Sequence, residues 1–229
     1  MRAMRVVSIV FSVVIVAGVV AIILYAGWKK NWPNQFETAF NSGGDISLDL
    51  SAGGYTIKGT AENQIRVEPD ANETRHVRCQ MLVAGSKAKV EVEGPSGNFH
   101  ATIYVPQRSE LHVDQTIGDM VVTNVEGDKN LDLGIGRLQV EVPADEPLPT
   151  FDGSVVLGSL CANNWHVQKG GFFRDFYSRS SGGYSLSAHV DIGDLETTEA
   201  SPKVGDSHSQ KSQDAGQDVS DQDSEDDSQ

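Results

Sequence analysis

The chain has 229 residues, of which 38% are hydrophobic, and this is enough for one domain with a core of its own. Its formal net charge is −14, and no basic patch offsets the acids. The chain therefore has no positively charged surface that could bind a phosphate backbone, which excludes nucleic acid as a partner.

An uncharged segment of 23 residues, from Val6 to Trp28, lies near the start of the chain. As a helix it would span roughly 35 Å, which matches the hydrocarbon core of a bilayer. The pattern predicts a transmembrane signal-anchor at residues 6–28. A cleaved signal peptide is the alternative, but the apolar region of such a peptide is usually about 7 to 15 residues long. In addition, the small-residue motif Val19 to Ala21 lies inside the apolar run instead of after it.

Positive charges are nearly balanced on the two sides of this segment, so they do not decide its orientation. Residues 1–5 are too few to form a domain. We expect them to be a cytoplasmic stub, with the bulk of the chain outside the cytoplasm; the opposite orientation is the alternative. Residues 29–40, which include the helix-breaking Pro33, are expected to form a juxtamembrane spacer.

Short strings of alternating apolar and polar residues fill positions 41–200, for example Ile46 to Leu50 and Leu138 to Val142. A period of two is typical of strands with one buried face. Nothing in this stretch has the pattern of a long amphipathic helix. The sequence therefore predicts one all-β domain over residues 41–200.

A glycine opens several of these strings, and the spacing indicates a repeated unit of about 17 to 22 residues. Large apolar residues follow each glycine at the second place and mostly at the fourth. One such unit cannot bury its own apolar face, whereas stacked units share a core. We therefore predict a single-stranded β-solenoid with coils of about 20 residues; a β-sandwich is the alternative. The glycines are Gly53, Gly97, Gly118, Gly136, Gly153 and Gly193.

Both ends of such a stack would need caps over their open edges. Phe36 and Phe40 are candidates at the first coil. An aromatic-rich insert is the candidate at the last coils, and its residues also form the candidate interaction surface, because aromatic rings contact sugar rings and protein partners. A purely structural cap is the competing interpretation. The residues of the insert are Trp165, Phe172, Phe173, Phe176 and Tyr177.

The two cysteines, Cys79 and Cys161, are expected to be small core thiols. A disulfide is an alternative, since an oxidising compartment would allow one. A zinc-like set with His76 and His166 is a further alternative, although His76 and Cys79 would point to opposite faces of one strand. We predict no metal and no cofactor.

Aspartates recur near the expected corners, at positions such as Asp114, Asp132 and Asp191. Corner aspartates are usually turn formers. A polysaccharide-active enzyme of β-helix type would need paired carboxylates, or a carboxylate with a base, on one face. The sequence does not clearly offer such a set, so we predict no catalytic residues and a protein that is not an enzyme.

Three segments resemble a known bacterial family: Thr102 to Pro106, Gly183 to Ala188 and Ile192 to Leu195. Together with the glycine units after a signal-anchor, they are similar to the domains labelled "putative adhesins". The resemblance covers about residues 38–199. It implies a right-handed, single-stranded β-helix tethered to the bacterial cytoplasmic membrane, and some members are linked to cell-envelope stress systems.

The chain ends in a Ser/Asp/Gln-rich tail at residues 201–229, which lacks the apolar residues needed to fold. Taken together, the sequence predicts a single-pass, non-enzymatic interaction or scaffold module of the cell envelope. Its partner would be an envelope protein, a surface polysaccharide or a second copy of itself. The alternatives are a polysaccharide-active enzyme and an accessory component of envelope-stress signalling.

Overall fold

The computed structural model describes residues 34–70, 76–95, 98–142, 148–180 and 183–200. In these residues the regular structure consists of strands and short 3₁₀ turns. No helix among them is both long and apolar enough to cross a membrane. The predicted anchor at 6–28 and the predicted tail at 201–229 lie outside the described residues.

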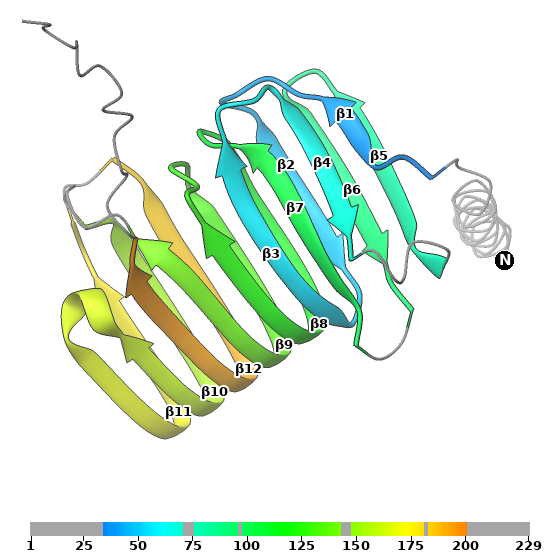
Figure 1. Ribbon diagram of the computed structural model, residues 1–229. Helices are drawn as coiled ribbons and strands as arrows, with labels where there is room; N and C mark the ends of the chain where they lie inside the picture. Colours follow the sequence, from blue (N-terminus) through cyan, green and yellow to red (C-terminus); the bar gives the residue numbers. More distant parts are fainter. Residues whose placement is uncertain (1–33, 71–75, 96–97, 143–147, 181–182, 201–229) are drawn as a thin grey trace, which may run out of the picture.

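Twelve strands form one mixed sheet, which confirms the all-β class (Figure 1). In chain order they are β1 (Glu37–Ala39), β2 (Asp45–Leu50), β3 (Gly53–Thr60), β4 (Gln64–Pro69), β5 (Arg78–Ala84), β6 (Lys87–Glu93), β7 (His100–Pro106), β8 (Glu110–Thr123), β9 (Lys129–Val142), β10 (Thr150–Ala162), β11 (Val167–Ser178) and β12 (Ser185–Glu199).

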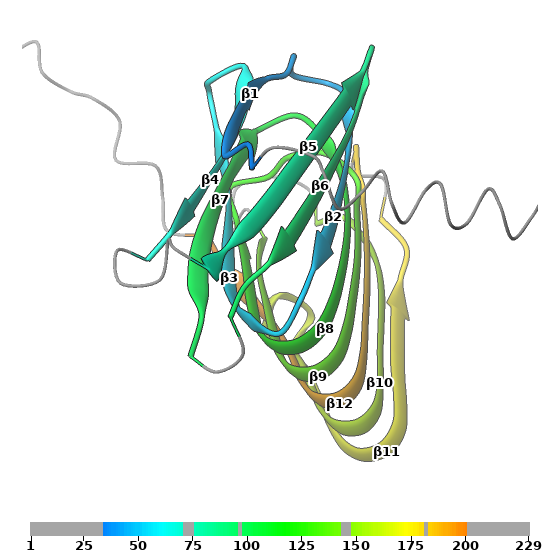
Figure 2. The same cartoon turned by 90° about the vertical axis from the view of Figure 1, so that its right-hand side faces the viewer.

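The long strands are bent into a U, and the U-shaped strands are stacked side by side (Figures 1 and 2). Each of β8, β9, β12 and β10 runs along one wall, turns through a bend and returns along the other wall, in parallel register with its neighbours. Between β8 and β9 the chain completes one turn and advances by one strand, since Leu111 lies beside Lys129. Buried side chains of the two walls face each other and form the core.

The sheet order differs from the predicted single-stranded solenoid. β12 lies between β9 and β10, although it follows both in sequence, and β11 runs antiparallel to β10. At the other end, β6 pairs with β2 and β7 pairs with β3, each on the side away from β8. There the walls consist of separate strands, β5-β6-β2 on one side and β1-β4-β7-β3 on the other, an arrangement closer to the sandwich alternative.

A column of glycines forms the bend. Gly118, Gly136, Gly193 and Gly158 are in register on adjacent strands, with φ of 128°, 142°, 139° and 145°. A Cβ at any of them would come within 1.7 to 1.8 Å of the carbonyl oxygen of a glycine on the next strand. Only glycine combines this φ with such a close approach of two backbones.

The predicted repeat is correct on β3, where Gly53 pairs with Gly118, and on β8, β9 and β12, but it is wrong on β10. Gly158 belongs to the bend column, whereas the predicted Gly153 pairs with Ala188 in the wall. Leu157, predicted to be buried as the fourth residue after Gly153, therefore precedes the bend glycine and is 38% exposed. The predicted Gly97 lies outside the described residues.

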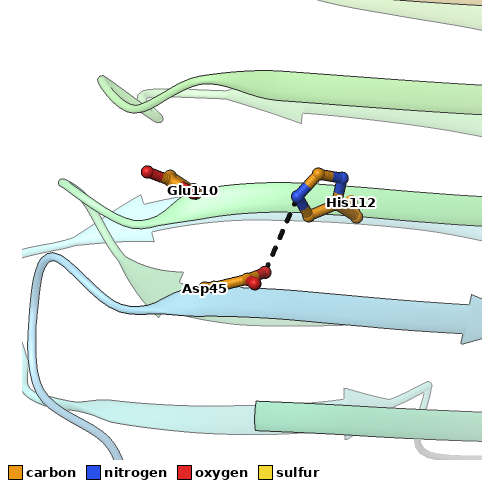
Figure 3. A group of neighbouring side chains, drawn as sticks. All are labelled: Asp45, Glu110 and His112. Carbon is orange, nitrogen blue, oxygen red and sulfur yellow. Dashed lines mark ion pairs between the residues drawn. The ribbon is translucent and has the colours of Figure 1, made fainter. Parts of the chain in front are cut away.

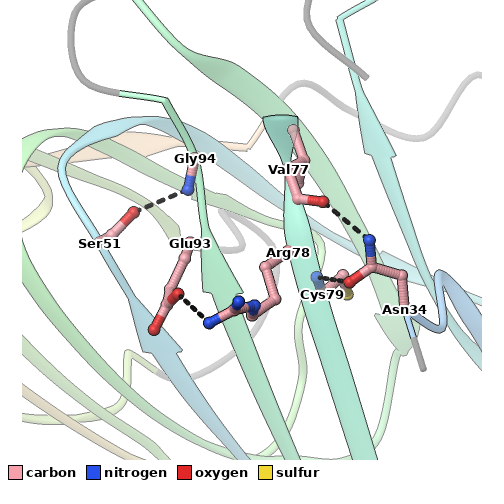
Figure 4. A network of polar contacts seen from close by, with 7 residues as sticks. All are labelled: Asn34, Ser51, Val77, Arg78, Cys79, Glu93 and Gly94. Carbon is pink, nitrogen blue, oxygen red and sulfur yellow. Dashed lines mark hydrogen bonds and ion pairs between the residues drawn. The ribbon is translucent and has the colours of Figure 1, made fainter. Parts of the chain in front are cut away.

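The first described residues are attached to β5 (Figure 4). The side-chain amide of Asn34 donates to the carbonyl oxygen of Val77 (3.1 Å) and accepts from the amide of Cys79 (3.3 Å). β1 then pairs with β4, and Phe40 is buried in the core. The sheet thus begins inside the predicted spacer at 29–40, since β1 lies within it. Burial of Phe40 fixes this segment to the first layer of the core.

At the opposite end, β11 pairs only with β10 among the described strands, so its other edge is open. Lys169 and Arg174 lie opposite buried residues of β10. They donate hydrogen bonds to the backbone oxygens of Asp175 (2.6 Å) and Gly170 (2.7 Å). Charged side chains at an open edge disfavour pairing with a further strand.

Candidate interaction surface

A column of exposed apolar side chains follows the outside of the bend. The residue before each bend glycine is aliphatic, and Phe172 of β11 continues the column because it pairs with Leu157. With adjacent strands ~4.8 Å apart, five residues in register extend for about 19 Å. We call this column the bend ridge. Its residues and their exposed fractions are Ile117 (45%), Ile135 (44%), Ile192 (46%), Leu157 (38%) and Phe172 (67%).

The local backbone explains why these side chains face outward. Along β8 every second residue is buried as far as Gln115, and burial resumes at Met120. The residues between them turn the corner around the core, so Ile117 lies on the convex side. The buried amide of Gln115 supports the turn by donating to the carbonyl oxygens of Gly53 (2.7 Å) and Ile117 (3.1 Å).

The rim of the bend ridge is mainly acidic. Asp119, Arg137 and Asp194 follow the bend glycines of β8, β9 and β12, and Asp191 directly precedes Ile192. Asp194 accepts a hydrogen bond from Ser159 on the neighbouring strand. The surface is therefore an apolar line bordered by three carboxylates and one guanidinium.

The aromatic residues predicted as the interaction surface separate into two groups. Trp165 and Phe176 are half-buried and pack on the core: the indole stacks on Phe151 with ring centroids 4.6 Å apart, and Phe176 lies 6.0 Å from the same ring. Phe173 (77% exposed) and Tyr177 (55%) are exposed like Phe172. The insert thus contributes both a cap and part of an exposed surface.

A second surface lies on the outer face of the wall formed by β6, β2, β8 and β9. It contains a hollow of about 330 Å³. Asp49, Asp114 and Asp132 line it on three adjacent strands in register, together with Lys89 and His112. This is the set of paired carboxylates with neighbouring bases that the sequence did not clearly offer.

Asp45, Glu110 and His112 lie at one end of the same face. One donor atom from each lies within 4.8 Å of the others, so these residues could hold a metal ion. Sequence analysis missed them because Asp45 and Glu110 are far apart in the chain. Only the pairing of β2 with β8 brings the two carboxylates together.

The cysteines do not meet. Cys79 is fully buried in β5, Cys161 is half-buried in β10, and both are free thiols. β5 and β10 lie toward opposite ends of the sheet, so the disulfide and the zinc set with His76 and His166 are both wrong. Burial raises the pKa of the Cys79 thiol to about 12, as expected for an inert core thiol.

No model of a known protein family matches this chain, and neither does a curated protein. Among solved structures, it is similar to a putative cell adhesion protein from Clostridium sporogenes ATCC 15579, with 13% identity over 72% of this chain and 98% of that one, at a TM-score of 0.44.

Two further similar structures are putative adhesins. The one from Parabacteroides merdae ATCC 43184 has 8% identity over 71% of this chain and 94% of that one (TM-score 0.20). The one from Bacteroides fragilis NCTC 9343 has 10% identity over 71% and 95% (TM-score 0.21). All three are bacterial and carry an adhesion label. It is the label of the family that the sequence resembles.

Proposed function

We propose that this protein is a non-enzymatic, adhesin-like interaction module of the bacterial cell envelope, tethered to the membrane by residues 6–28, and that it binds a protein partner through the bend ridge. The observation that carries this proposal is the in-register column of five exposed apolar side chains. An exposed apolar line of this kind, bordered by polar groups, is typical of a surface that contacts another macromolecule.

The chemistry of the ridge favours a protein over a polysaccharide. Sugar rings pack on aromatic faces, whereas four of the five ridge residues are aliphatic. The acidic rim, with Asp119, Asp191 and Asp194, favours a partner whose apolar patch is bordered by lysine or arginine. It also disfavours anionic lipid headgroups, which the same carboxylates would repel.

Photo-crosslinking in cells tests this proposal. A photoreactive amino acid replaces Ile135 on the ridge or, as the matched control, Asn130, which is exposed on the outer wall of the same strand. The expected result is one crosslinked product of defined mass from position 135 and none from position 130. The crosslinked peptide of the partner should contain apolar residues next to lysine or arginine.

Serine at Ile117 and Ile192 in the same chain should abolish the crosslink from position 135, because the partner loses two adjacent contacts. Products from positions 135 and 130 in equal amount, or a product that persists in the double serine variant, would refute the ridge as the binding surface. A product of twice the mass of the chain would identify the partner as a second copy.

A polysaccharide-active enzyme is the second candidate, and the hollow on the outer wall favours it. Asp49 and Asp114 lie directly opposite each other on adjacent parallel strands ~4.8 Å apart. The two carboxyl groups of a retaining glycosidase lie about 5 to 5.5 Å apart. Release of soluble sugar from isolated cell-wall polysaccharide, lost in Asp114→Asn, would establish this activity; no release by the wild-type chain would eliminate it.

A further inference from the structure

We infer that Asp45, Glu110 and His112 form a binding site for one first-row divalent cation, of which Zn²⁺ is the representative. The site lies on the outer wall, apart from the bend ridge. It requires neither the proposed partner nor an enzymatic role for the hollow. Figure 3 shows the three side chains on the adjacent strands β2 and β8.

The register of β2 and β8 creates the set. Asp45 and Glu110 are directly opposite each other, and His112 lies two residues further along β8, on the same face of the strand. Its Nε2 is 3.7 Å from Oδ1 of Asp45. The backbone of two paired strands therefore fixes where the three side chains start, and only the side-chain torsions remain to be set.

The charges at this site are not balanced within it. Two carboxylates directly opposite each other on neighbouring strands destabilise the sheet. One ammonium group, Nζ of Lys87 on β6, lies 3.0 Å from Oδ2 of Asp45. The same ammonium group also interacts electrostatically with Glu110, so one positive charge faces two carboxylates. A divalent cation would neutralise both carboxylates at once.

The donor types select the class of ion. An imidazole nitrogen favours zinc, iron and nickel over calcium and magnesium, which prefer oxygen ligands alone. Three protein ligands with room for water are typical of open zinc sites. His112 is half-exposed, Asp45 is partly exposed, and Glu110 is exposed, so water and ion both have access.

Only a small movement is needed. Ligands bound to one zinc ion at about 2.1 Å lie roughly 3.4 Å from each other. The three donor atoms already lie within 4.8 Å of one another, and rotation of exposed side chains closes the difference. The Lys87 side chain, which is 75% exposed, is free to turn into solvent when the ion takes its place.

Calorimetric titration of the full-length chain with Zn²⁺ tests the site. His112→Ala should remove the tightest binding event. Glu110→Gln should lower the Zn²⁺ affinity at least about tenfold, because even substitutions of residues that only contact the metal ligands cause losses of this size. His189→Ala is the matched control. His189 also pairs with a carboxylate, Asp191 at 3.1 Å, but it belongs to no group of three such donors among the described residues.

A gain of affinity separates the site from any effect on folding. Lys87→Met removes the competing ammonium group and should strengthen Zn²⁺ binding several-fold, which a damaged fold cannot do. Circular dichroism should be unchanged in all four variants. Binding that is the same in His112→Ala and Glu110→Gln as in the wild type would overturn the inference. Equal losses in His112→Ala and His189→Ala would also overturn it, since they would indicate unspecific binding to surface histidines.

Discussion

Replacing the buried Lys129 by methionine is expected to stabilise the protein at neutral pH. Lys129 is 3% exposed, and burial lowers the pKa of its ammonium group from 10.5 to about 8. At about 1.4 kcal/mol per pH unit this corresponds to about 3 kcal/mol. A cation–π contact with Tyr184, 4.1 Å from Nζ to the ring centroid, and a hydrogen bond from Nζ to the carbonyl oxygen of Gly127 (2.9 Å) each offset ~1 kcal/mol of this cost. Methionine should therefore gain about 1 kcal/mol.

The pH dependence follows from the direction of the pKa change. Below pH 8, Lys129 is charged in both the folded and the unfolded chain, and the fold bears the full cost of burying the charge. Between pH 8 and 10.5 the unfolded chain binds more protons, so this part of the unfolding free energy rises with pH. The advantage of Lys129→Met should accordingly shrink across this range.

Urea unfolding followed by circular dichroism at pH 7, 8, 9 and 10 measures this difference. Cys79, whose pKa is raised to about 12 by burial, acts in the opposite direction above pH 9, but equally in both proteins, so the difference isolates Lys129. Lys58→Met is the control, because Lys58 is exposed, and it should change stability by less than about 0.5 kcal/mol. A Lys129→Met chain less stable than wild type at every pH would refute the reasoning.

Three further predictions concern the bend, the open edge and the core thiol. Gly136→Ala should lower the free energy of unfolding by roughly 3 kcal/mol or more, because the residue has a positive φ and the added Cβ would lie 1.8 Å from a backbone oxygen. Gly170→Ala is the control: nothing lies within 4 Å of the added Cβ, so the free energy of unfolding should hardly change in the same urea assay. Leucine at both Lys169 and Arg174 removes the charges at the β11 edge and should produce concentration-dependent oligomers in sedimentation velocity; a chain that stays monomeric would contradict their protective role. Cys79 should resist iodoacetamide at pH 8 until guanidinium unfolds the chain, as measured by mass spectrometry, and rapid labelling of the native protein would contradict its burial.

Sequence patterns located the strands well because a period of two directly reports which side chains are buried. The second residue after the bend glycine is buried at Met120, Leu138 and Leu195, as the repeat predicts. On β10 the pattern contained two glycines. It did not distinguish Gly153 from Gly158, because both precede an alternating string and only pairing with β12 decides which one is at the bend.

The candidate site was predictable only in part. The sequence shows the aromatic insert as a local enrichment in Trp, Phe and Tyr. Which of its rings are packed on the core, such as the half-buried Trp165, and which are exposed, such as Phe173, depends on which face of the hairpin covers the core. The isoleucines of the bend ridge had a signal in the repeated Ile-Gly-Asp and Ile-Gly-Arg motifs. An isoleucine in a β pattern is normally buried, however, so its exposure required knowledge of the corner.

By itself, the sequence determined an all-β domain, its strand periodicity and the bend glycines of β8, β9 and β12, because these depend on local alternation and on the φ angle that only glycine adopts easily. The tertiary structure alone decided the order of the strands. Gly136, Gly193 and Gly158 offer nearly the same backbone surface to a neighbour, so the repeat fits any order of stacking. The insertion of β12 between β9 and β10, the apolar line across the bend and the meeting of Asp45 with Glu110 all follow from pairing between strands distant in the chain.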